Sequence, residues 1–138
     1  MVRTQIRLTE EQARQLRATA ASAGRSMADL IREGVDRLAA ASLELVSSNC
    51  VIVETFALLQ GRIGLDAVRA LQQDVLPAFR MAWIDTNVHR AAVTAALATG
   101  KRRLSLVDCS SFELIRRGGL ERVLHFDRHF TEQGFEAA

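Results

Sequence analysis

Residues 104–127 have the sequence LSLVDCSSFELIRRGGLERVLHFD, and this stretch decides the fold class. Leu104–Val107 and Val123–Phe126 are short apolar runs of the kind that form buried strands, and the residues between them show helical periodicity. An acid follows each run, Asp108 after the first and Asp127 after the second. Two strands connected through a helix predict neighbouring parallel strands in an α/β layer fold.

The alternation of strands and helices continues upstream. The pattern predicts strands over residues 43–47 and 79–84 and helices over residues 48–59, 65–76 and 86–99. Residues 43–138 are therefore expected to form one α/β domain around a mainly parallel sheet. We expect Trp83, Cys50 and Cys109 to lie in its core.

Acidic side chains occur where the predicted strands end. The carboxyl ends of parallel strands share one edge of a sheet, where α/β proteins bind their ligands, so Asp108 and Asp127 are expected to lie close together. Glu54 lies on the apolar face of the predicted helix containing VIVETFALL, where an unpaired charge is costly. Converging carboxylates favour Mg²⁺ or Mn²⁺, which activates water against a phosphodiester. Alternatively, both aspartates cap helices and Glu54 forms an ion pair with Arg62 or Arg103.

The first 42 residues show a different pattern. Val2–Leu8 alternates with period two, which predicts a strand with Arg3, Gln5 and Arg7 on one face. Two capping signals then predict two helices separated by a tight turn at Gly24. So short a segment does not bury a core alone, and two copies are expected to pair their strands as an antiparallel ribbon. The segment holds seven Arg against five acids, whereas the remainder is balanced at eleven basic and eleven acidic residues, so the excess positive charge lies in the predicted ribbon unit.

The stretches RTQIRLTEEQ (residues 3–12) and GRSMADLIREGV (residues 24–35) resemble the ribbon-helix-helix family, which includes the Arc and MetJ repressors and many antitoxins. The resemblance implies that residues 1–42 form a swapped-dimer domain that binds operator DNA and regulates transcription. It also implies base contacts from Arg3, Gln5 and Arg7 and a phosphate contact at Ser26. The alternative from the residues alone is an exposed strand and two packing helices without DNA.

The stretches VET (residues 53–55), LSLVDCSSF (104–112) and FDRHF (126–130), with GF at 134–135, resemble the PIN domain of VapC-type toxins. The resemblance implies a Mg²⁺-dependent endoribonuclease, a hydrolase in which Glu54, Asp108 and Asp127 are three of four acids that bind the metal. Ser110 and Ser111 are implied to assist as hydroxyls near it. Such domains begin with a strand that ends in an Asp and is followed by a helix. Residues 43–138 therefore resemble a PIN-like α/β/α domain that lacks this first strand-helix unit and its catalytic Asp.

Composition excludes several classes of protein. Apolar residues make up 49% and charged residues 25%, which excludes a disordered or low-complexity chain. No apolar run approaches the ~18 residues of a membrane-spanning helix. Two cysteines make no disulfide framework, and the first residues lack a secretory signal, so the expected location is the cytoplasm.

Three functions agree with these patterns. The favoured one is a toxin–antitoxin protein in which a DNA-binding head is fused to a PIN-type ribonuclease portion with an incomplete site. The second is an active metal-dependent ribonuclease in which three acids suffice, and the third is a non-catalytic protein that pairs with an intact partner subunit. The expected partners are operator DNA, RNA and a second copy through residues 1–42, with no membrane contact.

Overall fold

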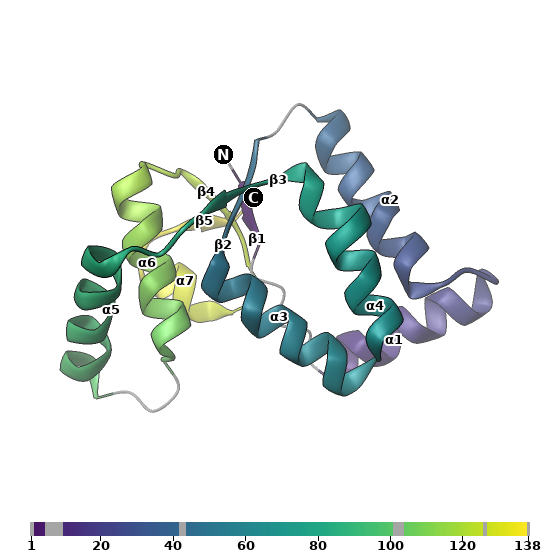
Figure 1. The fold of residues 1–138 in the computed structure, drawn as a ribbon, viewed down its shortest axis with the longest axis horizontal. Helices are drawn as coiled ribbons and strands as arrows, with labels where there is room; N and C mark the ends of the chain where they lie inside the picture. The colour runs from purple at the N-terminus through teal and green to yellow at the C-terminus, as the bar shows by residue number, and fades with distance from the viewer. Residues whose placement is uncertain (1, 5–9, 42–43, 101–103, 126, 138) are drawn as a thin grey trace.

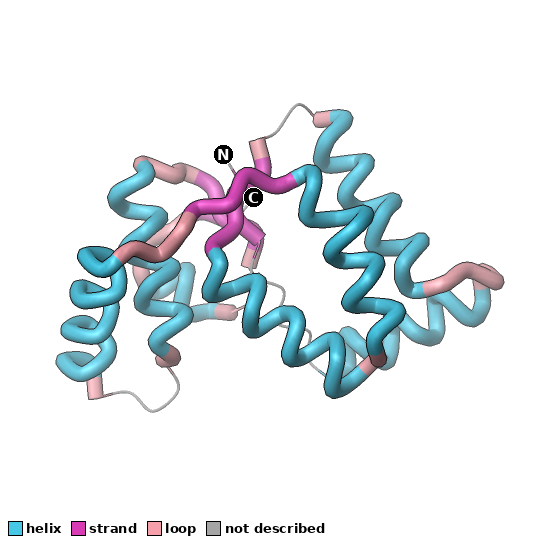
Figure 2. Tube along the Cα trace, in the orientation of Figure 1, coloured by secondary structure: helices cyan, strands magenta, loops and turns pink. Residues whose placement is uncertain are grey.

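The computed structural model describes residues 2–4, 10–41, 44–100, 104–125 and 127–137. In this part of the chain helices predominate and surround one central sheet (Figures 1 and 2). The strands are β1 (Val2–Thr4), β2 (Leu45–Ser48), β3 (Phe79–Ala82), β4 (Arg122–Leu124) and β5 (Glu136–Ala137). The α-helices are α1 (Glu10–Ser22), α2 (Met27–Ala40), α3 (Asn49–Arg62), α4 (Leu65–Ala70), α5 (Thr86–Thr99), α6 (Leu106–Gly118) and α7 (Arg128–Glu132). A π-helix, η1 (Leu71–Val75), and a 3₁₀ turn, η2 (Leu76–Ala78), continue α4.

The sheet is parallel at every described pairing, which confirms the predicted α/β class. Its strand order is β3-β2-β1-β4-β5, so β1 is the central strand and β3 and β5 lie at the edges. Arg3 of β1 is opposite Val46 of β2 on one side and Val123 of β4 on the other. The carboxyl ends of all five strands therefore lie along the same edge of the sheet.

The position of β1 differs from the expected antiparallel ribbon between two chains. Both edges of Val2–Thr4 pair in parallel with strands of the same chain, so this segment has no open edge for a second copy. The sheet also differs from one that lacks its first strand-helix unit, because β1, α1 and α2 precede β2 in the described chain. Pairing β1 between β2 and β4 satisfies backbone groups that a truncated sheet would leave exposed at its centre.

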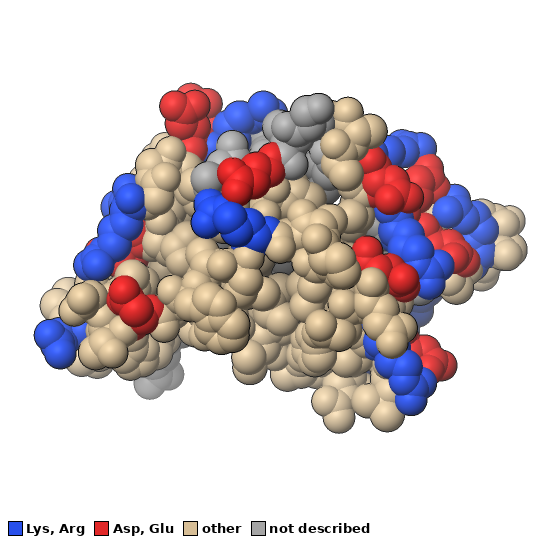
Figure 3. All heavy atoms as spheres, turned by 45° about the horizontal axis from the view of Figure 1, so that its top comes forward, with Lys and Arg blue, Asp and Glu red and all other residues tan. Residues whose placement is uncertain are grey.

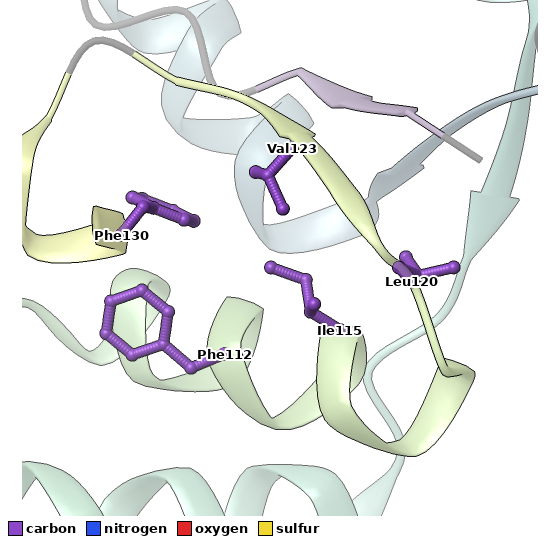
Figure 4. Packing of buried hydrophobic residues seen from close by; sticks show 5 residues of the cluster. All are labelled: Phe112, Ile115, Leu120, Val123 and Phe130. Atoms are coloured by element: carbon purple, nitrogen blue, oxygen red, sulfur yellow. The ribbon is translucent and has the colours of Figure 1, made fainter. Parts of the chain in front are cut away.

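Among the described residues, two hydrophobic clusters pack around the sheet. The first joins α6, β4 and α7 and is shown in Figure 4; its buried members are Phe112, Ile115, Leu120, Val123 and Phe130. The second joins α2 to η1, with partly buried side chains of α3 packed against it; its buried members are Val35, Leu71 and Val75. Helices α5, α6 and α7 lie on one side of the sheet in Figure 1, and α1 to α4 lie on the other. The domain is thus layered around its sheet, as the family resemblance implied.

Local signals account for several element boundaries. Ser26 is the N-cap of α2, where the capping signals predicted the start of a helix. Ser48 is the N-cap of α3 and accepts a hydrogen bond from the Val51 N–H at 3.3 Å. Gly100, with φ of 59°, ends α5 in the left-handed conformation that favours glycine. No described helix is long and apolar enough to cross a membrane.

The predicted core residues have different outcomes. Cys109 is buried as predicted, and Cys50 is half-buried. Trp83, in contrast, is 74% exposed, because the edge strand β3 ends at Ala82 and leaves Trp83 in the segment before α5. The prediction of a core tryptophan was therefore wrong.

Candidate active site

Asp108 is fully buried in the first turn of α6. Residues 104–107, which the structure describes, do not form the predicted strand. Ser105 is instead an N-cap, and the helix begins at Leu106. Ser105 Oγ accepts a hydrogen bond from the Asp108 N–H at 3.1 Å. In return, Asp108 Oδ2 accepts hydrogen bonds from the Ser105 N–H at 2.9 Å and the Ser105 hydroxyl at 2.7 Å. This capping box supplies the hydrogen bonds that a buried carboxylate needs.

Asp127 is the N-cap of α7, one of the two roles that its sequence position predicts. Its Oδ1 accepts a hydrogen bond from the His129 N–H at 2.9 Å. The Nδ1 atom of the His129 ring also lies 2.8 Å from Oδ1, without the geometry of a hydrogen bond. The side chains of Asp127 and His129 are 20% and 13% exposed, so the carboxylate lies at the border of solvent.

The hydrophobic core connects the elements that carry these two acids. Phe112 of α6 packs edge to face on Phe130 of α7, and both rings are buried (Figure 4). Phe112 follows Asp108 by one helical turn, and Phe130 lies in the short helix that Asp127 caps. The fold thus brings the two acid-bearing helix starts onto the same cluster.

Glu54 comes from a third element. It is half-buried in α3, which follows the carboxyl end of β2 directly and packs against α6. Within the described ranges, no three His, Cys, Asp or Glu side chains are grouped closely enough to hold a metal ion. The structure therefore packs the Glu54 helix and the Asp127 helix around α6 without closing a site of three ligands.

The residues after Asp108 form a buried polar run. Ser110 is buried and donates its hydroxyl to the Val107 carbonyl oxygen at 2.9 Å, and Ser111 is fully buried. Burial raises the pKa of the Cys109 thiol, the negative charge of Asp108 raises it further, and Arg116 opposes the shift. The thiol consequently stays protonated at neutral pH and adds no charge beside Asp108.

The residues expected to bind DNA are not gathered on a described surface. Arg3 lies in the central strand β1, while Gln5 and Arg7 fall outside the described residues. The Ser26 hydroxyl accepts a hydrogen bond from the Asp29 N–H and donates one to Asp29 Oδ2, at 3.1 and 2.7 Å. The hydrogen bond from the Ser26 hydroxyl to Asp29 Oδ2, followed by the one from the Ser26 N–H to the same oxygen, lowers the pKa of Asp29. Ser26 thus acts as a helix cap here.

Arginines of the second helix and of the turn before it are paired with acids of the same chain. Arg25 contacts Glu33, and Arg32 contacts both Asp29 and Asp74, with nitrogen–oxygen distances of 2.5 to 2.9 Å. Basic and acidic side chains alternate at this end of the molecule in Figure 3. The local excess of Arg in residues 1–42 is therefore partly neutralised by nearby carboxylates.

Sequence reasoning missed His125, which lies between β4 and Asp127. Its Nδ1 is 2.9 Å from the Asp127 carbonyl oxygen, which only accepts, so Nδ1 carries the proton. The His125 ring stacks on the Phe130 ring, with the ring centroids 5.2 Å apart. Its Nε2 atom is buried without a hydrogen-bond partner among the described residues. A single histidine inside an apolar run gives no spacing signal, so the sequence pattern did not mark this side chain.

The structure and sequence are similar to those of characterised proteins. A family model described as PIN domain matches residues 20–136. The 23S rRNA-specific endonuclease VapC20 of Mycobacterium tuberculosis, found in two strains, is 29% identical over 92 residues, which are 66% of this chain and 70% of that protein. The crystal structure of M. tuberculosis VapC20, described as a Sarcin-Ricin loop cleaving toxin, superposes with a TM-score of 0.64 at 29% identity and covers 78% of this chain and 85% of that one. Because the family model spans most of its length, the chain belongs to the PIN-domain family.

Proposed function

We propose that the chain is an endoribonuclease of the toxin–antitoxin class that cleaves structured RNA, with a ribosomal hairpin loop as its substrate type. The observation that carries this proposal is the placement of Asp108 and Asp127 at the starts of two helices packed on one core cluster. The similarity to VapC20, whose name gives 23S rRNA as its target, supports the choice of RNA.

Glu54, Asp108 and Asp127 are the residues proposed to bind a divalent cation. Carboxylate oxygens are the ligands that Mg²⁺ and Mn²⁺ prefer, so the donor chemistry fits either ion. When bound, such a cation lowers the pKa of water and stabilises negative charge on a phosphodiester. Carboxylates without a cation repel one another.

The acid set has one further feature that bears on activity. The sequence contains no Asp or Glu before Glu10, so the end of the first strand contributes no carboxylate from residues 1–9. We propose that the three remaining acids suffice, and that an antitoxin protein is the regulatory partner. The absence of an acid at the end of the first strand favours one alternative. In it, the chain binds RNA and antitoxin but does not cleave the RNA.

Operator DNA binding and dimerisation through residues 1–42 stay predictions of the sequence pattern. The described contacts support them less, because β1 pairs within its own chain and Ser26 caps α2. Loss of DNA affinity and of its salt dependence in Arg3→Ala and Arg7→Ala variants would support this role. Unchanged binding in both would contradict it.

The proposal is tested by cleavage of a sarcin–ricin-type RNA hairpin by the purified chain in Mn²⁺, Mg²⁺ or EDTA. We expect cleavage with either metal and none with EDTA. The Asp108→Asn variant should not cleave, whereas Asp29→Asn should cleave like the wild type, because Asp29 occupies the same helix position in a capping box on α2. Equal cleavage by both variants, or no cleavage by the wild type, would contradict the proposal.

A further inference from the structure

The described part of the chain contains two capping boxes of nearly the same geometry. In α6, Asp108 Oδ2 lies 2.9 Å from the Ser105 nitrogen and 2.7 Å from its hydroxyl. In α2, Asp29 Oδ2 lies 3.1 Å from the Ser26 nitrogen and 2.7 Å from its hydroxyl. In each box the serine Oγ accepts the N–H of the aspartate at 3.1 Å. As local structures that begin a helix, the two boxes are equivalent.

The two boxes differ in their surroundings. Asp29 is half-buried and contacts Arg32 at the surface, whereas Asp108 is fully buried and precedes a buried polar run. A surface carboxylate finds water in any orientation, but a buried one depends on the donors that its surroundings provide. For Asp108, two of these donors come from the single residue Ser105.

From this difference we infer that Ser105 is a positioning residue for the Asp108 carboxylate. Its N–H and hydroxyl both bind Oδ2, so the carboxylate is fixed at one oxygen and its rotation about the Cβ–Cγ bond is restricted. The inference rests on the proposed function, in which Asp108 binds the divalent cation. Metal-binding carboxylates are held in this way by hydrogen bonds from residues behind them.

The test separates positioning of Asp108 from simple helix capping. Ser105→Ala keeps the backbone donor and removes the hydroxyl, and Ser105→Thr restores a hydroxyl at the same place. Asp29→Ala breaks the matching box in α2, and it measures the effect of losing such a box away from the acids. Each full-length variant is titrated with Mn²⁺ alone by calorimetry, then assayed for hairpin cleavage, and its thermal midpoint is recorded.

We expect Ser105→Ala to weaken Mn²⁺ affinity by about ten- to a hundred-fold and to lower the cleavage rate, with recovery in Ser105→Thr. Asp29→Ala should lower the thermal midpoint while Mn²⁺ affinity and cleavage stay at the wild-type level. A Ser105→Ala variant that binds Mn²⁺ and cleaves like the wild type would overturn this inference and leave the proposed function intact. A wild-type chain that neither binds Mn²⁺ nor cleaves RNA would overturn both.

Discussion

The Phe112 ring meets the Phe130 ring edge to face, with centroids 4.9 Å apart and ring planes at 77°. Phe112 belongs to the helix that carries Asp108, and Phe130 belongs to the helix that Asp127 caps. Such pairs contribute about 0.5–1.5 kcal/mol beyond the area they bury. The core contact, and not the two carboxylates, therefore holds the acid-bearing helix starts together.

Replacing Phe130 should damage both stability and the site. Phe130 is 0% exposed, so Phe130→Ala is expected to lower the free energy of unfolding by about 3–5 kcal/mol. Mn²⁺ affinity should fall as well, because α7 loses its main contact with α6. Urea denaturation and metal titration measure the two effects. Leu97→Ala, at a side chain 78% exposed, is the control and should change stability by less than about 0.5 kcal/mol; equal stability of the two variants would contradict this account of the core.

The thiol of Cys109 should be unreactive in the folded chain. Burial raises the pKa of the Cys109 thiol, so the folded state favours the protonated thiol. The contribution of this thiol to the free energy of unfolding is therefore fully present at pH values below the ordinary thiol pKa. As pH rises from about 8 to about 10, the unfolded chain ionises first, and the free energy of unfolding should fall relative to a Cys109→Ala variant. Parallel curves for the two chains over this range would refute the assignment.

A second measurement on Cys109 uses its chemistry directly. In a Cys50→Ser background, a thiol reagent should react with Cys109 slowly in native buffer and rapidly in denaturant, because the thiolate is the reactive form and Cys109 is buried. Equal rates in both conditions would mean that Cys109 is accessible.

Removing residues 1–9 should disturb the sheet far from the chain terminus. Arg3 is opposite Val46 and Val123, so the deletion takes away the strand between β2 and β4. Hydrogen exchange at the backbone amides of these two strands is expected to rise, and the thermal midpoint to fall by several degrees. An independent ribbon unit makes the opposite prediction, namely unchanged exchange in β2 and β4.

The strand at the N-terminus shows what the sequence pattern can predict and what it cannot. Period-two alternation predicted a strand, and Val2–Thr4 is one. The pattern says nothing about the partner strand, and alternating polar residues are more typical of a half-exposed antiparallel strand than of a central parallel one. The ribbon prediction followed this local rule, whereas the pairing in the structure is set by β2 and β4, which are distant in sequence.

In the candidate site, too, features set by neighbouring residues were predictable from the sequence, and features set by residues distant in sequence were not. Helix capping by Asp127 was predictable, because the signal lies within a few residues. The start of α6 was predicted wrongly, since LSLV satisfies the rule for a short buried strand while Ser105 and Asp108 satisfy the rule for a capping box. His125 was missed because its contacts depend on the ring of Phe130 and on the local turn at Asp127.

The most direct test of the account compares Asp127→Asn with Asp85→Asn in single-turnover cleavage of the RNA hairpin with Mn²⁺. Both aspartates are helix N-caps, and Asp85 Oδ1 accepts hydrogen bonds from the Asn87 and Val88 N–H groups at 2.9 and 2.8 Å. Asparagine caps a helix about as well as aspartate, so both variants should fold with similar stability. We expect Asp127→Asn to cleave no faster than the wild type in EDTA, while Asp85→Asn should cleave at the wild-type rate. Equal, metal-dependent cleavage by both variants would contradict a role for Asp127 in the site.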